Sequence, residues 1–130
     1  MSCCIENSRY NLCIWQGETF GLTVTVKDVA GNVTNITGYS ARMQIRESYD
    51  SGTATETLTT ANGEITITGA EGNVAIELAA SRTANISVDL SGPGRPPKQT
   101  YVYDLELIDT ANVVSKLLFG DAVVYAEVTK

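Results

Sequence analysis

The stretch Tyr101-Val-Tyr-Asp-Leu-Glu-Leu-Ile108 decides the fold, because it contains neither Gly nor Pro and alternates between two faces. One face is apolar or aromatic throughout: Tyr101, Tyr103, Leu105 and Leu107. The other face carries the carboxylates of Asp104 and Glu106. This pattern is typical of a β-strand that covers a core with one side and meets solvent with the other.

A second stretch, Ala41-Arg-Met-Gln-Ile-Arg46, has the same period of two. Its apolar side chains point one way, whereas Arg42 and Arg46 point the other way. Basic residues on one outward face and acidic residues on another favour adjacent antiparallel strands. We therefore predict that Arg42 and Arg46 form cross-strand pairs with Asp104 and Glu106 at the centre of a sheet.

The rest of the chain predicts about eight short strands separated by turn residues. The clearest are a first strand at 10–15, a strand at 20–27, a threonine-rich edge strand at 55–60, and a hairpin of 65–68 with 74–79. A helical turn capped by Ser81 is expected within 79–86. Gly120 and Asp121 separate two further strands at 113–118 and 122–128. The predicted fold class is a single antiparallel all-β sandwich.

The inward positions of these strands predict the core. Its expected members are Phe20, Leu22, Val24, Val26, Met43, Ile45, Ile67, Ile76, Leu78, Tyr103, Leu105 and Leu107. A chain of 130 residues has room for one such core. We expect an N-terminal arm at 1–8 and one sandwich domain at 9–130.

The composition argues against several classes of function. A formal net charge of −6, with no basic run, argues against nucleic-acid binding. The apolar runs are strand-sized, so no membrane span is expected, and the N-terminus lacks the pattern of a signal peptide. There is no histidine, which removes the commonest general base and metal ligand. We expect no cofactor, no metal and no small-molecule substrate.

Two chemical alternatives accompany the structural interpretation of the polar residues. Asp104 and Glu106 would lie about 7 Å apart as a catalytic pair on one strand face, but opposite-charge pairing across the sheet explains them more simply. Cys3, Cys4 and Cys13 all lie near the N-terminus. They are expected to be free thiols, and a disulfide from Cys13 to Cys3 or Cys4 is the alternative.

Six short motifs resemble a family of small structural domains from tailed bacteriophages. The motifs, in order, are Gln16-Gly-Glu-Thr-Phe20, Leu22-Thr-Val24, Ile36-Thr-Gly-Tyr39, Ala41-Arg-Met-Gln-Ile-Arg46, Tyr103-Asp-Leu-Glu-Leu107 and Glu127-Val-Thr-Lys130. Such domains occur in virion proteins, including the N-terminal sandwich of upper baseplate and tail-fibre proteins. The resemblance extends from Asn11 to Lys130. It implies an immunoglobulin-like sandwich with a structural role and no catalytic residues.

The resemblance further implies a non-enzymatic virion protein of the tail, baseplate or fibre attachment, assembled in the host cytoplasm. Its partners would be other virion proteins and copies of itself. Two alternatives remain: a capsid decoration protein, and a free carbohydrate- or receptor-binding module. A sugar-binding module should cluster Trp and Tyr side chains on one sheet face, and a single Trp with scattered Tyr residues argues against it.

The candidate contact residues come from segments longer than folding requires, and from aromatic residues with no assigned core position. The segments are the N-terminal arm with the first strand, and the Pro-rich loop at 92–98. The predicted partner-contact residues are Ile5, Tyr10, Trp15, Tyr49, Arg95, Pro96 and Tyr125.

Overall fold

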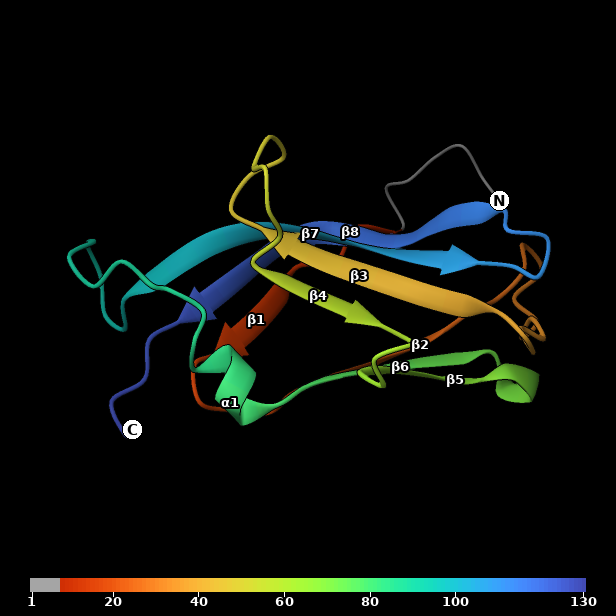
Figure 1. Cartoon of the computed structure of the whole chain (residues 1–130), viewed down its shortest axis with the longest axis horizontal. Coiled ribbons are helices and arrows are strands. Elements are labelled where there is room, and N and C mark those ends of the chain that lie inside the picture. The colour runs from red at the N-terminus through yellow and green to blue at the C-terminus, as the bar shows by residue number, and fades with distance from the viewer. Residues whose placement is uncertain (1–7) are drawn as a thin grey trace.

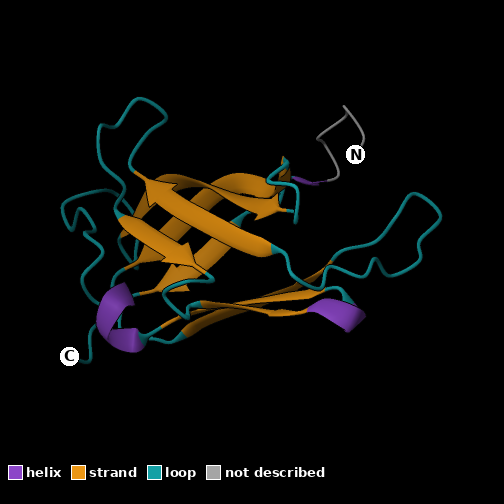
Figure 2. Cartoon of the chain, turned by 45° about the vertical axis from the view of Figure 1, so that its right-hand side comes forward, coloured by secondary structure: helices purple, strands orange, loops and turns teal. Residues whose placement is uncertain are grey.

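The computed structural model describes residues 8–130, which form eight β-strands in two facing sheets (Figure 1). The elements in chain order are β1 (Leu12–Trp15), β2 (Phe20–Thr25), β3 (Ser40–Arg46), β4 (Glu56–Thr59), β5 (Ile65–Thr68), η2 (Gly69–Glu71), β6 (Asn73–Leu78), α1 (Ala80–Thr83), β7 (Lys98–Ile108) and β8 (Val114–Tyr125). The two short helices lie at opposite ends of the smaller sheet (Figure 2). The all-β sandwich predicted from the alternating sequence is confirmed.

The order of the strands is that of an immunoglobulin-like domain. The larger sheet has the order β1-β8-β7-β3-β4, and the smaller has the order β2-β6-β5. With β2 as strand B and β8 as strand G, these sheets contain the G-F-C-C′ and B-E-D arrangements of the immunoglobulin fold. The larger sheet, which contains β7 and β8, therefore faces the smaller sheet, in which β6 is the central strand.

One strand pair departs from the predicted antiparallel arrangement. β1 pairs with β8 in parallel, whereas every other pair among the described strands is antiparallel. The prediction of a wholly antiparallel sandwich is wrong at this pair. The reason is that the turn at 16–19 carries the chain across to the smaller sheet instead of back along the same sheet.

The predicted pairing of the two central strands is confirmed. β3 and β7 are adjacent and antiparallel in the middle of the larger sheet. Arg42 lies opposite Glu106 in this register, as expected for an oppositely charged pair. Arg46, however, lies opposite Val102, so its predicted acidic partner is not directly across the ladder.

The core lies between the two sheets and contains the inward residues of β3, β6 and β7. Met43, Ile76 and Leu105 are among its buried side chains. Five predicted members are only half-buried: Phe20, Leu22, Val24, Val26 and Ile67. They lie in or beside β2 and β5, which are the edge strands of the smaller sheet. An inward side chain of an edge strand has a neighbouring strand on one side only, so part of it stays in contact with solvent.

The segment after Val113 forms one twelve-residue strand, β8, and not two strands separated by Gly120 and Asp121. Gly120 serves another purpose, because a Cβ atom at this position would lie 2.6 Å from the carbonyl oxygen of Tyr10. A glycine in a strand often marks such a close backbone approach. Gly120 therefore lets the chain before β1 pass directly against β8.

Two buried tyrosines of β7 use their hydroxyl groups to hold neighbouring segments. Tyr101 donates a 2.6 Å hydrogen bond to the Ser87 carbonyl, as the tyrosine corner of immunoglobulin-like domains does at the same place in the fold. Tyr103 donates a 2.5 Å hydrogen bond to the Tyr10 carbonyl. Burial raises the pKa of both phenols, so each remains a protonated donor near neutral pH.

The helix α1 forms within the expected segment, but Ser81 does not cap it. Ala79 occupies the N-cap position and supplies no side-chain hydrogen bond. The buried Thr83 fixes the helix instead, since its hydroxyl donates to the Glu18 carbonyl over 2.9 Å and accepts from the Gly17 amide over 3.1 Å. Within residues 8–130, no helix has both the length and the apolar character needed to cross a membrane.

Candidate interaction surface

The outer face of the larger sheet carries exposed aromatic side chains at one edge. Alternate residues of β1 point into the core, so Cys13 and Trp15 point outward. Trp15 is 41% exposed, and its ring stacks on Tyr125 of β8 with the ring centroids 4.7 Å apart. Cys13 is paired with Val123 in the same two strands. We call Cys13, Trp15, Val123 and Tyr125 the aromatic patch.

The Pro-rich loop reaches the same end of the sheet. Lys98, the first residue of β7, lies opposite Tyr125, and the Pro97 carbonyl accepts a 2.9 Å hydrogen bond from the Ala126 amide. The exposed residues Arg95 and Pro96 directly precede Pro97, so the loop reaches the sheet at the end that carries Tyr125. Figure 1 shows this loop projecting beyond the end of β7.

The other predicted contact residues lie elsewhere. Tyr49 is in the β3–β4 loop, where it lines a depression with Arg46 and Val102 on the outer face. Tyr10 precedes β1 and bonds to Phe119, at the opposite end of β1 from Trp15. The prediction of contact by Ile5 lies outside the described residues, as do Cys3, Cys4 and nearly all of the arm at 1–8. The structure thus gathers Trp15, Tyr125 and the Pro-rich loop, but not Tyr10.

A row of alternating charges crosses the same outer face. Arg42 of β3 bonds to Glu106 of β7 over 2.7 Å, which confirms one predicted pair. Lys116 of β8 pairs with Asp104 and lies 3.5 Å from the second oxygen of Glu106. We call Arg42, Glu106, Lys116 and Asp104 the ladder. Its members come from three strands. Two of the side chains are positive and two are negative, so the ladder has no net charge.

The predicted pair of Arg46 with Asp104 is wrong. The Arg46 guanidinium donates to the Ser51 carbonyl and to the Gln44 side chain, each over 2.8 Å. Asp104 pairs with Lys116 instead, because β8, which carries Lys116, lies on the side of β7 opposite to β3. The strand 113–118 was expected from the sequence, but the bulge between Leu105 and Glu106 that sets this register was not.

The ladder suits a structural role better than acid catalysis. The hydrogen bond from Arg42, aided by the charge of Lys116, lowers the pKa of Glu106. Burial opposes the ionised form of Lys116, but Asp104 and Glu106 outweigh it and raise the Lys116 pKa. A carboxylic acid that donates a proton near neutral pH needs a raised pKa. Glu106 is shifted in the opposite direction and is held ionised.

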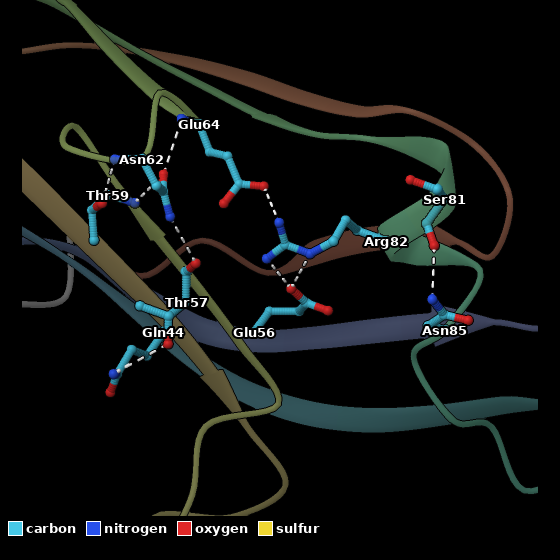
Figure 3. A network of polar contacts seen from close by, with 9 residues as sticks. All are labelled: Gln44, Glu56, Thr57, Thr59, Asn62, Glu64, Ser81, Arg82 and Asn85. Atoms are coloured by element: carbon cyan, nitrogen blue, oxygen red, sulfur yellow. Dashed lines mark hydrogen bonds and ion pairs between the residues drawn. The ribbon is translucent and has the colours of Figure 1, made fainter.

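A second charged cluster joins the two sheets (Figure 3). Arg82 of α1 bonds to Glu56, the first residue of β4, and to Glu64, which immediately precedes β5. The side chains of Glu56 and Glu64 are only 11% and 16% exposed. We call these three residues the clamp. The hydrogen bond to Glu56, followed by the charges of both carboxylates, raises the Arg82 pKa against the effect of burial.

The sequence does not predict the clamp. Glu56 and Arg82 are separated by 26 residues, and only the packing of α1 against the end of both sheets brings them together. One oxygen of Glu64 is buried and has no hydrogen-bond partner among residues 8–130. The ionised form of Glu64 is therefore stabilised by its ion pair with Arg82.

Comparison with protein-family models finds no match to this sequence, and comparison with curated proteins finds none either.

Proposed function

We propose that the protein is a structural component of a tailed bacteriophage particle, in the tail, baseplate or fibre attachment, and that it acts through protein–protein contacts without catalysis. The observation that carries this proposal is the aromatic patch. A stacked Trp–Tyr pair on an open sheet face offers a large apolar contact with polar atoms at its rim. Such residues are enriched at protein interfaces.

The surroundings of the patch support the same role. Arg95 and Pro96 are exposed on the adjoining loop, and Tyr49 lies on the same face over β3 and β7. The remaining half of the face carries the ladder, whose charges are internally paired. A partner that binds the aromatic half therefore leaves the ladder undisturbed, and it would need an acidic or polar group to match Lys98, which lies opposite Tyr125.

The test is the content of purified particles. Density-banded particles of the phage that encodes this chain should contain it, as detected by mass spectrometry. The double variant Trp15→Ala, Tyr125→Ala should fold normally, judged by its melting transition, but should be incorporated poorly. Val29→Ala, which truncates a fully exposed apolar side chain far from the patch, is the matched control.

Two results would contradict this proposal, and they are distinguishable. Particles that lack the chain would overturn the virion role. Particles that contain the double variant in normal amount would retain the virion role but remove the aromatic patch from the interface. Immunogold labelling of heads instead of tails would favour the capsid decoration alternative.

A carbohydrate-binding module is a second candidate, and one observation favours it. The aromatic residues are scattered along the sequence, yet Trp15 and Tyr125 are stacked on one sheet face. A glycan array probed with the protein and with Trp15→Ala would test this function. Binding of a defined sugar that Trp15→Ala abolishes would support it, and no binding to any glycan would reject it.

A further inference from the structure

We propose that the free edge of β2 pairs with the same edge of a second copy of this chain, which joins two three-stranded sheets into one six-stranded sheet. β2 lies at the end of the smaller sheet, and its only strand partner within residues 8–130 is β6. This surface is separate from the aromatic patch. The inference therefore stands whether or not the protein belongs to a phage particle.

The backbone of β2 leaves hydrogen-bonding groups at this edge. The Val26 amide donates a 2.8 Å bond to the Gly72 carbonyl in the β2–β6 register, so residues 20, 22 and 24 are the ones that bond to β6. The amides and carbonyls of Gly21, Thr23 and Thr25 must then point away from β6. None of these groups has a backbone partner in the part of the chain that the structure describes.

The opposite edge of the sandwich, at β4, is treated differently. Thr57 and Thr59 direct their backbone groups away from β3, and the Asn62 side chain bonds to both (Figure 3). It accepts from the Thr59 amide over 3.1 Å and donates to the Thr57 carbonyl over 3.3 Å. Proteins commonly cover an edge that would otherwise add a foreign strand. Two outward backbone groups of β4, the Thr59 amide and the Thr57 carbonyl, are covered in this way, whereas the longer β2 edge has no strand beside it among residues 8–130.

The side chains along β2 suit a second copy. Residues 20–25 contain no charged side chain and no Pro, either of which would disfavour strand pairing at this edge. The chain carries a net charge of −6, so two copies repel each other less along this uncharged edge than along their acidic surfaces. A groove beside the edge is lined by apolar side chains, among them Leu22, Val24 and Leu118. Tyr10 lines the same groove and is 51% exposed. Pairing of two copies would cover this apolar seam from both sides.

The register of such a pair is set by its two-fold symmetry. With Thr23 opposite Thr23 of the second copy, Gly21 lies opposite Thr25, and all three positions present backbone groups toward the partner strand. Leu22 then lies opposite Val24 on the inner face, in the closer non-hydrogen-bonded pairs. Both faces of the new strand pair match: threonines and glycines meet outside, and aliphatic side chains meet inside.

The first test uses a charge at the symmetry axis. Sedimentation equilibrium of the full chain should show a monomer–dimer equilibrium. Thr23→Lys would place two lysines opposite each other and should abolish the dimer, since like charges directly across a ladder are unfavourable. Thr66→Lys, an exposed site on the same sheet face of β5, should leave the dimer intact. A wild type that stays monomeric, or a Thr23→Lys variant that still dimerises, would overturn the proposal.

The second test reads the register directly and identifies the occupant. In a chain with Cys3, Cys4 and Cys13 replaced by Ser, Thr23→Cys should form an intermolecular disulfide under mild oxidation, because its Cα atoms would lie about 5.5 Å apart. Thr25→Cys should not form this disulfide. Thr25 lies opposite Gly21 of the second copy, so the two introduced cysteines would be displaced by four residues, or about 13 Å, along the strands. Equal crosslinking at both sites would overturn the register. Loss of the dimer on deletion of residues 2–7 would assign the dimer contact to the N-terminal arm and would overturn the proposal.

Discussion

The two charged clusters contain the same kinds of side chain in opposite surroundings. The clamp joins Arg82 to Glu56 and Glu64 between the sheets, and both of its carboxylates are nearly buried. The ladder joins four charges on the outer face, where the Glu106 and Asp104 side chains are 23% and 43% exposed. The Arg42 side chain is 54% exposed, against 40% for that of Arg82. One cluster holds the two sheets together, whereas the other covers a sheet face that is already hydrogen-bonded.

Burial, and not the number of ion pairs, decides what such a cluster contributes to stability. A buried carboxylate has lost its hydration and relies on its partner, so removing that partner leaves an uncompensated charge. An exposed carboxylate regains water when its partner is removed. The same substitution, Arg→Ala, should therefore have very different consequences at positions 82 and 42.

The largest effect is expected at the clamp. Arg82→Ala should lower the free energy of unfolding by about 1–3 kcal/mol, because the largely buried carboxylates of Glu56 and Glu64 would lose their donor, while the 40% exposed position of Arg82 admits some water to them. Urea denaturation monitored by circular dichroism measures the change. Ser81→Ala, at the exposed neighbouring position that does not cap α1, is the control and should change stability by less than about 0.5 kcal/mol. A loss below about 1 kcal/mol for Arg82→Ala would show that the clamp is hydrated in solution.

An apolar replacement of the whole clamp separates the effect of charge from the effect of packing. The triple variant Arg82→Met, Glu56→Leu, Glu64→Leu should recover most of the stability lost in Arg82→Ala or exceed that of wild type. The reason is that no buried charge remains to be desolvated. Thermal melting of the three proteins side by side checks this. A triple variant no more stable than Arg82→Ala would show that the uncompensated charges of Glu56 and Glu64 are not what destabilises Arg82→Ala.

A small effect is expected at the ladder. Arg42→Ala should lower the free energy of unfolding by only about 0.2–1 kcal/mol, because Glu106 keeps Lys116 nearby and is partly solvated. High salt should shrink this difference further, whereas the effect of Arg82→Ala should persist. The same urea titrations, repeated at low and high salt, measure both. A loss at Arg42 as large as that at Arg82 would remove the distinction between the clusters.

The smallest effect is the pH dependence of the ladder. The Glu106 pKa is lowered in the folded state, so its contribution is fully present above the unfolded pKa of about 4.3 and is lost as pH falls through the folded value. The stability difference between wild type and Arg42→Ala should therefore be constant at neutral pH and narrow in acid. Unfolding measured at a series of pH values tests this. A difference that widened in acid would contradict the direction of the shift.

Much of the fold follows from the sequence alone, because strand alternation is a local property. The period of two in Tyr101–Ile108 and Ala41–Arg46 predicts both the strands and their inward faces. The opposite charges on their outward faces predict their pairing, and Arg42 does meet Glu106. The hairpin of β5 with β6 follows from two alternating runs joined by the turn residues 69–72, and the edge position of β4 follows from the threonine-rich stretch.

The rest was decided by tertiary structure, because it depends on which sheet a strand joins. The parallel place of β1 beside β8 follows from the crossover at 16–19, and it alone brings Trp15 onto Tyr125. Gly120 looks like a strand break in the sequence, yet it provides room for Tyr10. The clamp joins residues far apart in the chain, and the open edge of β2 exists only because β1 pairs with the other sheet. Local period determines a strand and its faces, whereas its neighbours are determined by how the whole chain packs.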